Sequence, residues 1–192
     1  MTDPQPVTGD PAYRAAIERE WADDDAYLRT SPHSPLPPEE REGYGGIPHF
    51  PIDESWRLRC LSLEPYAGAA PVSFEMEATR GAPRPAVRAG QFTFARDGAE
   101  HRLVVYQFLE DGVLDERLFL PFMDATSGVE TYPAGRYVEV TPDAGGLWTI
   151  DFNRCYHPSC VYSPRFSCPI TPAENRLPIR VEAGVRLDGH GH

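Results

Sequence analysis

Lysine does not occur among the 192 residues of this chain, so all 18 basic side chains are arginines. The absence excludes mechanisms that need a lysine amine, such as a Schiff base, a pyridoxal-phosphate linkage or a phosphate-loop lysine. Positive charge is scarce as well, since 29 acidic residues give a net charge of 18 − 29 = −11. Nucleic acids and anionic membranes are bound by a concentrated basic face. We therefore expect neither as a partner.

Long hydrophobic runs are also missing. No apolar stretch approaches the roughly 18 residues that a membrane-spanning helix needs. The N-terminal stretch MTDPQPVTGD is acidic, whereas a secretory signal is basic and then apolar. The sequence thus predicts a protein of the cytoplasm.

The chain has the length of one domain, and we expect a single domain over residues 1–192. Its N-terminal part is divided into a tail (1–10), a helix (11–28) and a proline-rich arm (30–51). Asp10 is placed to cap the helix and Pro11 to occupy its first position. Six prolines between residues 30 and 51 exclude regular structure there and predict an extended segment that wraps the surface.

From residue 52 the hydrophobic period changes to two, which is typical of half-buried strands. Val72, Phe74 and Met76 alternate with polar residues, and Asp97-Gly98 predicts a type I′ hairpin turn. Further strands are expected near 55–63, 116–121, 136–140, 147–152 and 178–183. With no helical pattern between them, the predicted fold is all-β: an antiparallel barrel or sandwich over 52–186, preceded by one helix and the arm and followed by a tail (187–192).

Polar and aromatic side chains gather in two long loops at strand ends, where all-β proteins usually bind ligands. Arg136 is predicted to open one strand and Asp151 to close another, so antiparallel neighbours can bring both to one rim. The expected ligand-binding residues are Asp124, Tyr132, Arg136, Asp151, Asn153, Tyr156 and Asn175. Asp151 and Glu174 are the candidates for a catalytic base. The alternative is that these groups brace the loops, whose backbone must be hydrogen-bonded in any case.

Two stretches carry a resemblance to a known family: FLPFMDATSGVETYPAGRY and DFNRCYHPSCVYSPRFSCPITPAENRLPI. They resemble the diagnostic segments of the family named domain of unknown function 1684, and SPLPPEEREGYGGIPHFPID resembles its N-terminal arm. The resemblance covers nearly the whole chain. It implies a single domain of family length and assigns no activity. Cys160 and Cys168 match the family pattern, whereas Cys155 and His157 depart from it.

The spacing of Cys155, His157, Cys160 and Cys168 places four possible zinc ligands within 14 residues. The spacing is irregular and contains no CxxC, so we expect buried, metal-free cysteines and no cofactor. A Cys160–Cys168 disulfide is geometrically open but unusual in a reducing cytoplasm. A Cys–His nucleophile is a further alternative, although nothing in the local sequence resembles a protease motif.

These observations favour a small-molecule-binding β domain whose polar Asp/Arg/Asn/Tyr pocket holds an anionic ligand. A planar arginine fork suits a carboxylate or phosphate group. Two alternatives stay open: a hydrolase with a carboxylate general base in the same pocket, and a structural or interaction protein without a site. A hydrolase needs two titratable groups within hydrogen-bond reach of one another and of solvent.

Overall fold

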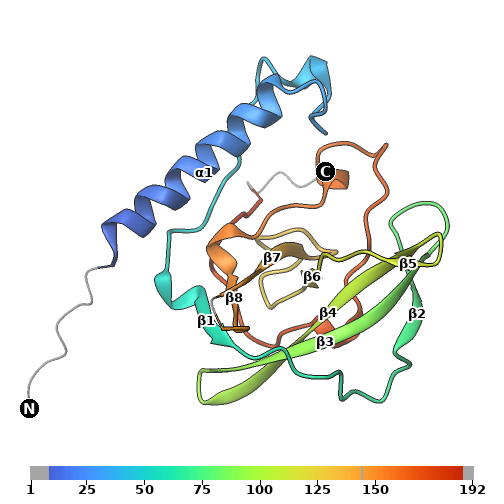
Figure 1. Ribbon diagram of the computed structural model, residues 1–192. Coiled ribbons are helices and arrows are strands. Elements are labelled where there is room, and N and C mark those ends of the chain that lie inside the picture. Colours follow the sequence, from blue (N-terminus) through green and yellow to red (C-terminus); the bar gives the residue numbers. More distant parts are fainter. Residues whose placement is uncertain (1–8, 144, 188–192) are drawn as a thin grey trace, which may run out of the picture.

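The computed structural model describes residues 9–143 and 145–187, and it consists of a curled antiparallel sheet preceded by one helix (Figure 1). The helix is α1 (Pro11–Thr30). The strands are β1 (Arg57–Leu61), β2 (Ser73–Met76), β3 (Arg84–Arg96), β4 (Ala99–Glu110), β5 (Val113–Leu114), β6 (Phe119–Phe122), β7 (Arg136–Pro142) and β8 (Trp148–Asp151). The sheet curls into a half-barrel, which confirms the predicted all-β class with a single N-terminal helix.

The strand order across the sheet is β1-β8-β7-β6-β4-β3-β2, with β5 paired to β4, and every pairing is antiparallel. The join between β4 and β6 is short, because its register consists of Tyr106 opposite Phe119. The chain after β1 curls back, and Glu64 and Gln91 exchange two backbone hydrogen bonds of 2.9 Å. Gly90 permits this approach, since a Cβ atom there would lie 2.7 Å from the Glu64 carbonyl oxygen.

The long β3–β4 hairpin turns at Asp97 and Gly98, whose φ angles are 51° and 76°. Two successive residues with positive φ define the predicted type I′ turn. Alternation along the hairpin then divides its side chains. Phe92 and Leu103 enter the main core inside the curl, whereas Val104 belongs to a second, smaller cluster.

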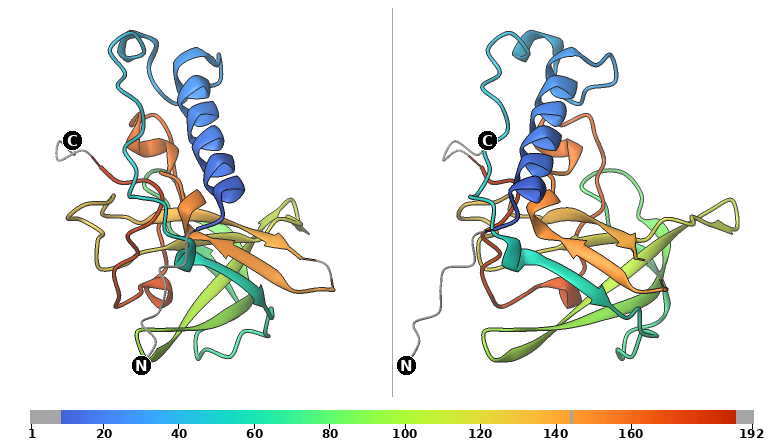
Figure 2. Two further views of the ribbon diagram at one scale, coloured as in Figure 1. Left: turned by 90° about the vertical axis from the view of Figure 1, so that its left-hand side faces the viewer. Right: turned by 60° about the vertical axis from the view of Figure 1, so that its left-hand side comes forward.

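Helix α1 begins at Pro11, as predicted, with the Asp10 carboxylate accepting a hydrogen bond from the Ala12 N–H. It ends at Thr30, two residues later than predicted. Tyr13 and Ile17 are buried near the end of β8, and the rest of the helix rises beside the arm (Figure 2). None of the helices in the described segments is both long and apolar enough to cross a bilayer.

The arm (30–51) contains one short 3-10 turn, Pro38–Glu40, and is otherwise irregular. It is anchored to α1 by the Ile47 N–H, which donates to the Asp25 carboxylate at 2.8 Å. The rings of Trp21 and His49 stack with their centroids 3.9 Å apart.

The predicted strand at 178–183 is wrong: residues 177–183 form neither a helix nor a strand. The carbonyls of Val181 and Ala183 accept hydrogen bonds from the Arg136 guanidinium, and the Val181 N–H donates to Asp124. Side chains therefore take the place of a neighbouring strand.

Candidate functional site

Arg136 and Asp124 form an ion pair inside the protein, with neither side chain exposed to solvent. The guanidinium donates to the carbonyls of Val181, Ala183 and Val185 at 2.7–3.0 Å and to Asp124 at 3.4 Å. The Asp124 carboxylate also accepts the Val181 N–H at 2.6 Å. The pair thus holds the C-terminal segment against the sheet.

Asp151 and Asn153 lie at the end of β8, where they meet helix α1. The Asp151 carboxylate accepts hydrogen bonds from the Tyr13 hydroxyl and the Arg154 guanidinium, both at 2.8 Å. The Asn153 amide donates to the Tyr13 oxygen at 3.0 Å. Burial, together with the hydrogen bond to Asp151, raises the pKa of Tyr13, which therefore stays a neutral donor. This network fixes the helix to the sheet.

Asn175 lies where β4 and β6 diverge. Its carboxamide accepts the Val104 N–H at 2.8 Å and donates to the carbonyls of Val104 and Pro121 at 2.7 and 2.8 Å. A carboxamide offers the same donor and acceptor as a peptide group. The side chain therefore bridges two strands that have separated.

The two predicted tyrosines face different neighbours. The Tyr132 hydroxyl lies 3.7 Å from the Cys160 sulfur, and the Tyr156 hydroxyl donates to Glu139 at 2.6 Å. The structure therefore joins Asp124 to Arg136 and Asp151 to Asn153, but no hydrogen bond links the two pairs among the described residues. Of the predicted set, Glu174 lines one surface cleft and Tyr156 another.

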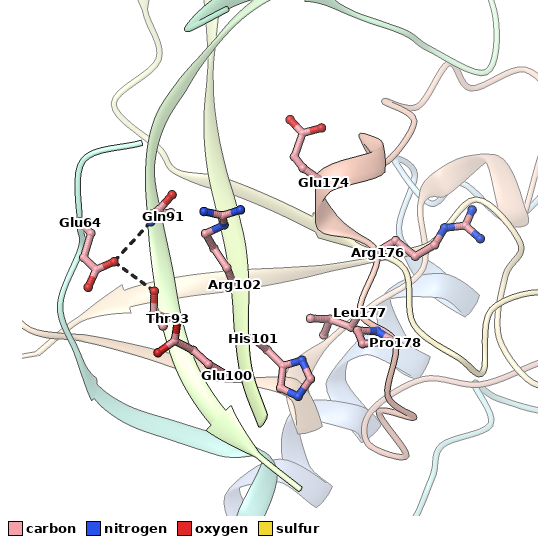
Figure 3. A pocket seen from close by; sticks show the side chains of 10 residues that line it. All are labelled: Glu64, Gln91, Thr93, Glu100, His101, Arg102, Glu174, Arg176, Leu177 and Pro178. Carbon is pink, nitrogen blue, oxygen red and sulfur yellow. Dashed lines mark hydrogen bonds between the residues drawn. The ribbon is translucent and has the colours of Figure 1, made fainter. Parts of the chain in front are cut away.

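The larger cleft, of about 600 Å³, lies between β4 and the segment that follows the short helix Ala173–Asn175 (Figure 3). We call it the β4-edge cleft. Its lining residues are Glu64, Gln91, Thr93, Glu100, His101, Arg102, Glu174, Arg176, Leu177 and Pro178.

Arg102 stands on β4 opposite Thr93, on the face turned away from the core residue Leu103. Its guanidinium extends into the space between Gln91 and Glu174 (Figure 3). Within the described residues it makes no side-chain hydrogen bond and no ion pair, in contrast to Arg88, which pairs with Glu174 at 2.7 Å.

The backbone of Arg102 is also available to a ligand. Val104 directs its N–H and C=O toward Asn175, away from β3. Because the pattern repeats every two residues in an antiparallel strand, the N–H and C=O of Arg102 lie at the same edge. No described backbone group pairs with them, so the cleft contains a stretch of open strand edge.

Three carboxylates line the cleft with Arg102, those of Glu64, Glu100 and Glu174. Glu64 accepts a hydrogen bond from the Thr93 hydroxyl at 3.0 Å. Glu174 accepts from Arg88 at 2.7 Å and from the Tyr106 hydroxyl at 3.1 Å, both through Oε1. Burial acts to raise the pKa of Glu174, but its own backbone N–H and Arg88 together lower it, so the carboxylate is ionised near neutral pH. Its second oxygen accepts no hydrogen bond from the described residues.

A smaller cleft, of about 280 Å³, lies between α1, the arm and residues 154–166. Tyr27, Tyr156, Tyr162 and Phe166 give it aromatic walls. Burial lowers the pKa of its His157 to about 4, so this imidazole is neutral at physiological pH.

The four possible zinc ligands do not meet at one point. Cys155 is buried and its thiol donates to the Ala183 carbonyl, and the His157 ring bonds to the Arg186 carbonyl. Cys160 and Cys168 lie together elsewhere. Over residues 9–143 and 145–187, no three His, Cys, Asp or Glu side chains are grouped to hold a metal ion.

The sequence did not single out Arg102. The only signal was its place in the strand sequence RLVVY. Leu103 and Val105 face the main core there, so Arg102 has to point to the opposite face. Comparison with known proteins adds no activity. No curated protein matches the sequence.

The solution NMR structure of an uncharacterized protein from Haloarcula marismortui is similar to this chain. Its sequence is 30% identical, the match covers 93% of this chain and 96% of that one, and the TM-score is 0.65. The family model described as "Protein of unknown function (DUF1684)" matches residues 42–186. The resemblance seen in the sequence is thereby confirmed, and the chain belongs to the DUF1684 family.

Proposed function

We propose that this protein binds a small polar molecule through a carboxylate or phosphate group in the β4-edge cleft. The observation that carries the proposal is the Arg102 guanidinium, which has no partner among the described residues. Beside it lies the open backbone edge of the same residue. A planar guanidinium forms two parallel hydrogen bonds to a carboxylate or phosphate.

The cleft also restricts the rest of the ligand. Glu64 and the open oxygen of Glu174 are acceptors, so a second anionic group there would be repelled. A ligand that places hydroxyl or ammonium groups near these carboxylates satisfies them. The class that fits is a hydroxy acid, an amino acid or a hydroxyalkyl phosphate, and a volume of about 600 Å³ accommodates any of these.

The sequence predicted an anionic ligand bound by Arg136. We keep the anionic ligand and assign its binding to Arg102. Arg136 directs its donors to backbone carbonyls and to Asp124. Nothing in the described geometry favours the hydrolase alternative, because a lowered pKa makes Glu174 a weak base and Asp151 already accepts several hydrogen bonds.

The test is an NMR titration of the labelled protein with gluconate, glutamate and glycerol 3-phosphate. Sorbitol and glycerol serve as matched probes that lack the acid group. We expect saturable shifts in the amides of Arg102 and Glu174 with at least one acidic probe and none with the neutral ones. Arg102→Gln should abolish the response, whereas Arg59→Gln, at an exposed arginine of β1, should retain it. Equal binding by wild type and Arg102→Gln, or no response to any acidic probe, refutes the proposal.

A further inference from the structure

Two cysteines, the half-buried Cys160 and the buried Cys168, lie side by side and do not line the β4-edge cleft. The Cys160 N–H donates to the Cys168 sulfur at 3.3 Å. Cys168 is itself held on both sides by Thr79: its N–H donates to the Thr79 hydroxyl at 3.0 Å, and its carbonyl accepts the Thr79 N–H at 2.8 Å. Backbone contacts therefore keep the two sulfurs adjacent.

The surroundings of Cys160 stabilise a thiolate. The polar groups around its sulfur are the Cys168 thiol, the Thr79 hydroxyl and the Tyr132 hydroxyl, whose oxygen lies 3.7 Å from the sulfur. These donors lower the pKa of Cys160 to about 6, against burial, which acts to raise it. Half-buried rather than enclosed, Cys160 can be reached by a small reagent.

The other titratable groups around this sulfur remain neutral. Burial raises the pKa of Tyr132 to about 12 and also raises that of Tyr137. The neighbouring Cys160 sulfur raises the pKa of Cys168. Near neutral pH the pair thus consists of one thiolate, Cys160, and one thiol, Cys168. This difference in protonation makes Cys160 the nucleophilic sulfur and leaves Cys168 as the thiol that can react with it afterwards.

We propose that Cys160 and Cys168 form a hydroperoxide-reactive dithiol, with Cys160 as the oxidised nucleophile and Cys168 as the resolving thiol. The Cys160 thiolate attacks the terminal oxygen of a hydroperoxide: the S–O bond forms, the O–O bond breaks, and the alkoxide leaves and takes a proton from solvent. Cys160 becomes a sulfenic acid. The Cys168 sulfur then attacks the Cys160 sulfur, and the hydroxyl leaves as water with the Cys168 proton. In sum, two thiols and one hydroperoxide give one disulfide, one alcohol and one water.

The experiment treats the full chain with hydrogen peroxide and analyses it by peptide mass spectrometry. We expect a Cys160–Cys168 disulfide, two hydrogens lighter than the reduced pair and reversed by dithiothreitol. In Cys168→Ser, dimedone should trap a sulfenic acid at Cys160. Cys60 is the internal control, because it is more exposed than Cys160. Exposure alone would therefore direct oxidation to Cys60.

A second measurement follows alkylation of wild type by iodoacetamide as a function of pH. A low pKa also weakens a thiolate as a nucleophile, so the midpoint of the profile, rather than the rate, is the readout. The midpoint for Cys160 should lie near 6, and Tyr132→Phe should move it upward. Tyr27→Phe, a tyrosine bonded to the His33 carbonyl, should leave it unchanged. The proposal fails if Cys60 is oxidised first, if no Cys160–Cys168 peptide forms, or if the Cys160 midpoint lies at the ordinary value of about 8.5.

Discussion

Replacing Arg136 with methionine is the sharpest test of the buried ion pair. The guanidinium serves three backbone carbonyls and the Asp124 carboxylate, and it has no exposed surface. Methionine keeps an apolar stem that can pack against Phe122, whose ring centre lies 5.0 Å from the guanidinium carbon. The loss is therefore one of hydrogen bonds and charge rather than of volume.

Breaking a buried ion pair by removing one partner costs about 3–5 kcal/mol, because the other charge is left uncompensated. The carbonyls left without a donor add to this cost. We expect Arg136→Met to lower the free energy of unfolding by about 5 kcal/mol, which is comparable to the whole stability of a marginal domain. In a protein of this size that corresponds to a fall in melting temperature of roughly 10–20 °C.

Urea denaturation followed by fluorescence measures the change, and hydrogen exchange locates it. The amides of residues 181–185 should lose protection first, because their segment is held by the guanidinium. Arg180→Met is the control: Arg180 forms ion pairs as well, with the carboxylates of Glu130 and Glu182, but on the exposed surface. Exposed pairs contribute little. If Arg136→Met lowered the free energy of unfolding by less than about 1 kcal/mol, the stabilising role of the buried ion pair would be refuted.

Three further predictions follow from the other buried polar groups. Asn175→Ala leaves the β4–β6 junction without its bridging amide and should cost about 3 kcal/mol in urea denaturation, with exchange rising in both strands; an unchanged exchange pattern would contradict the bridging role. Tyr13→Phe should cost about 1.5–3 kcal/mol, the value of a hydrogen bond to a charged group, and should loosen α1 in hydrogen exchange, whereas Tyr27→Phe should not. Because the folded-state pKa of His157 is lowered from 6.5 to about 4, its neutral form is favoured in the fold: its contribution is complete above pH 6.5 and is lost toward pH 4, by about 1.4 kcal/mol per pH unit. His157→Asn should flatten the pH dependence of the melting temperature over that interval.

Features set by neighbouring residues were predictable from the sequence. Asp10 and Pro11 mark the start of α1, and Asp97 with Gly98 marks the β3–β4 turn, because capping and positive φ are properties of adjacent positions. The end of α1 was placed two residues early, because the last turn continues to Thr30, whose hydroxyl donates to the Ala26 carbonyl.

Features set by long-range packing were not predictable. The sequence shows that Arg136 is polar and close to a strand, but not whether it faces a cavity or the core. Its burial depends on carbonyls some fifty residues later, at Val181 to Val185. The strand expected at 178–183 was lost for the same reason. Arg102, conversely, reads as an ordinary outward residue until the Asn175 segment is placed beside it.

Asn175 has a mechanical consequence for the whole fold. The sheet consists of two subsheets, one ending at β6 and the other beginning at β4, which are paired through Tyr106 and Phe119. Beside this pair, the Asn175 amide bridges the two subsheets through its hydrogen bonds to Val104 and Pro121. The Asn175 side chain therefore holds the two subsheets together beside the place where their backbone pairing ends. Glu174 and Arg176, the neighbours of Asn175 in the chain, line the β4-edge cleft, so the residue that joins the two subsheets also positions one wall of that cleft. The wall of the cleft and the joining of the two subsheets thereby depend on one side chain.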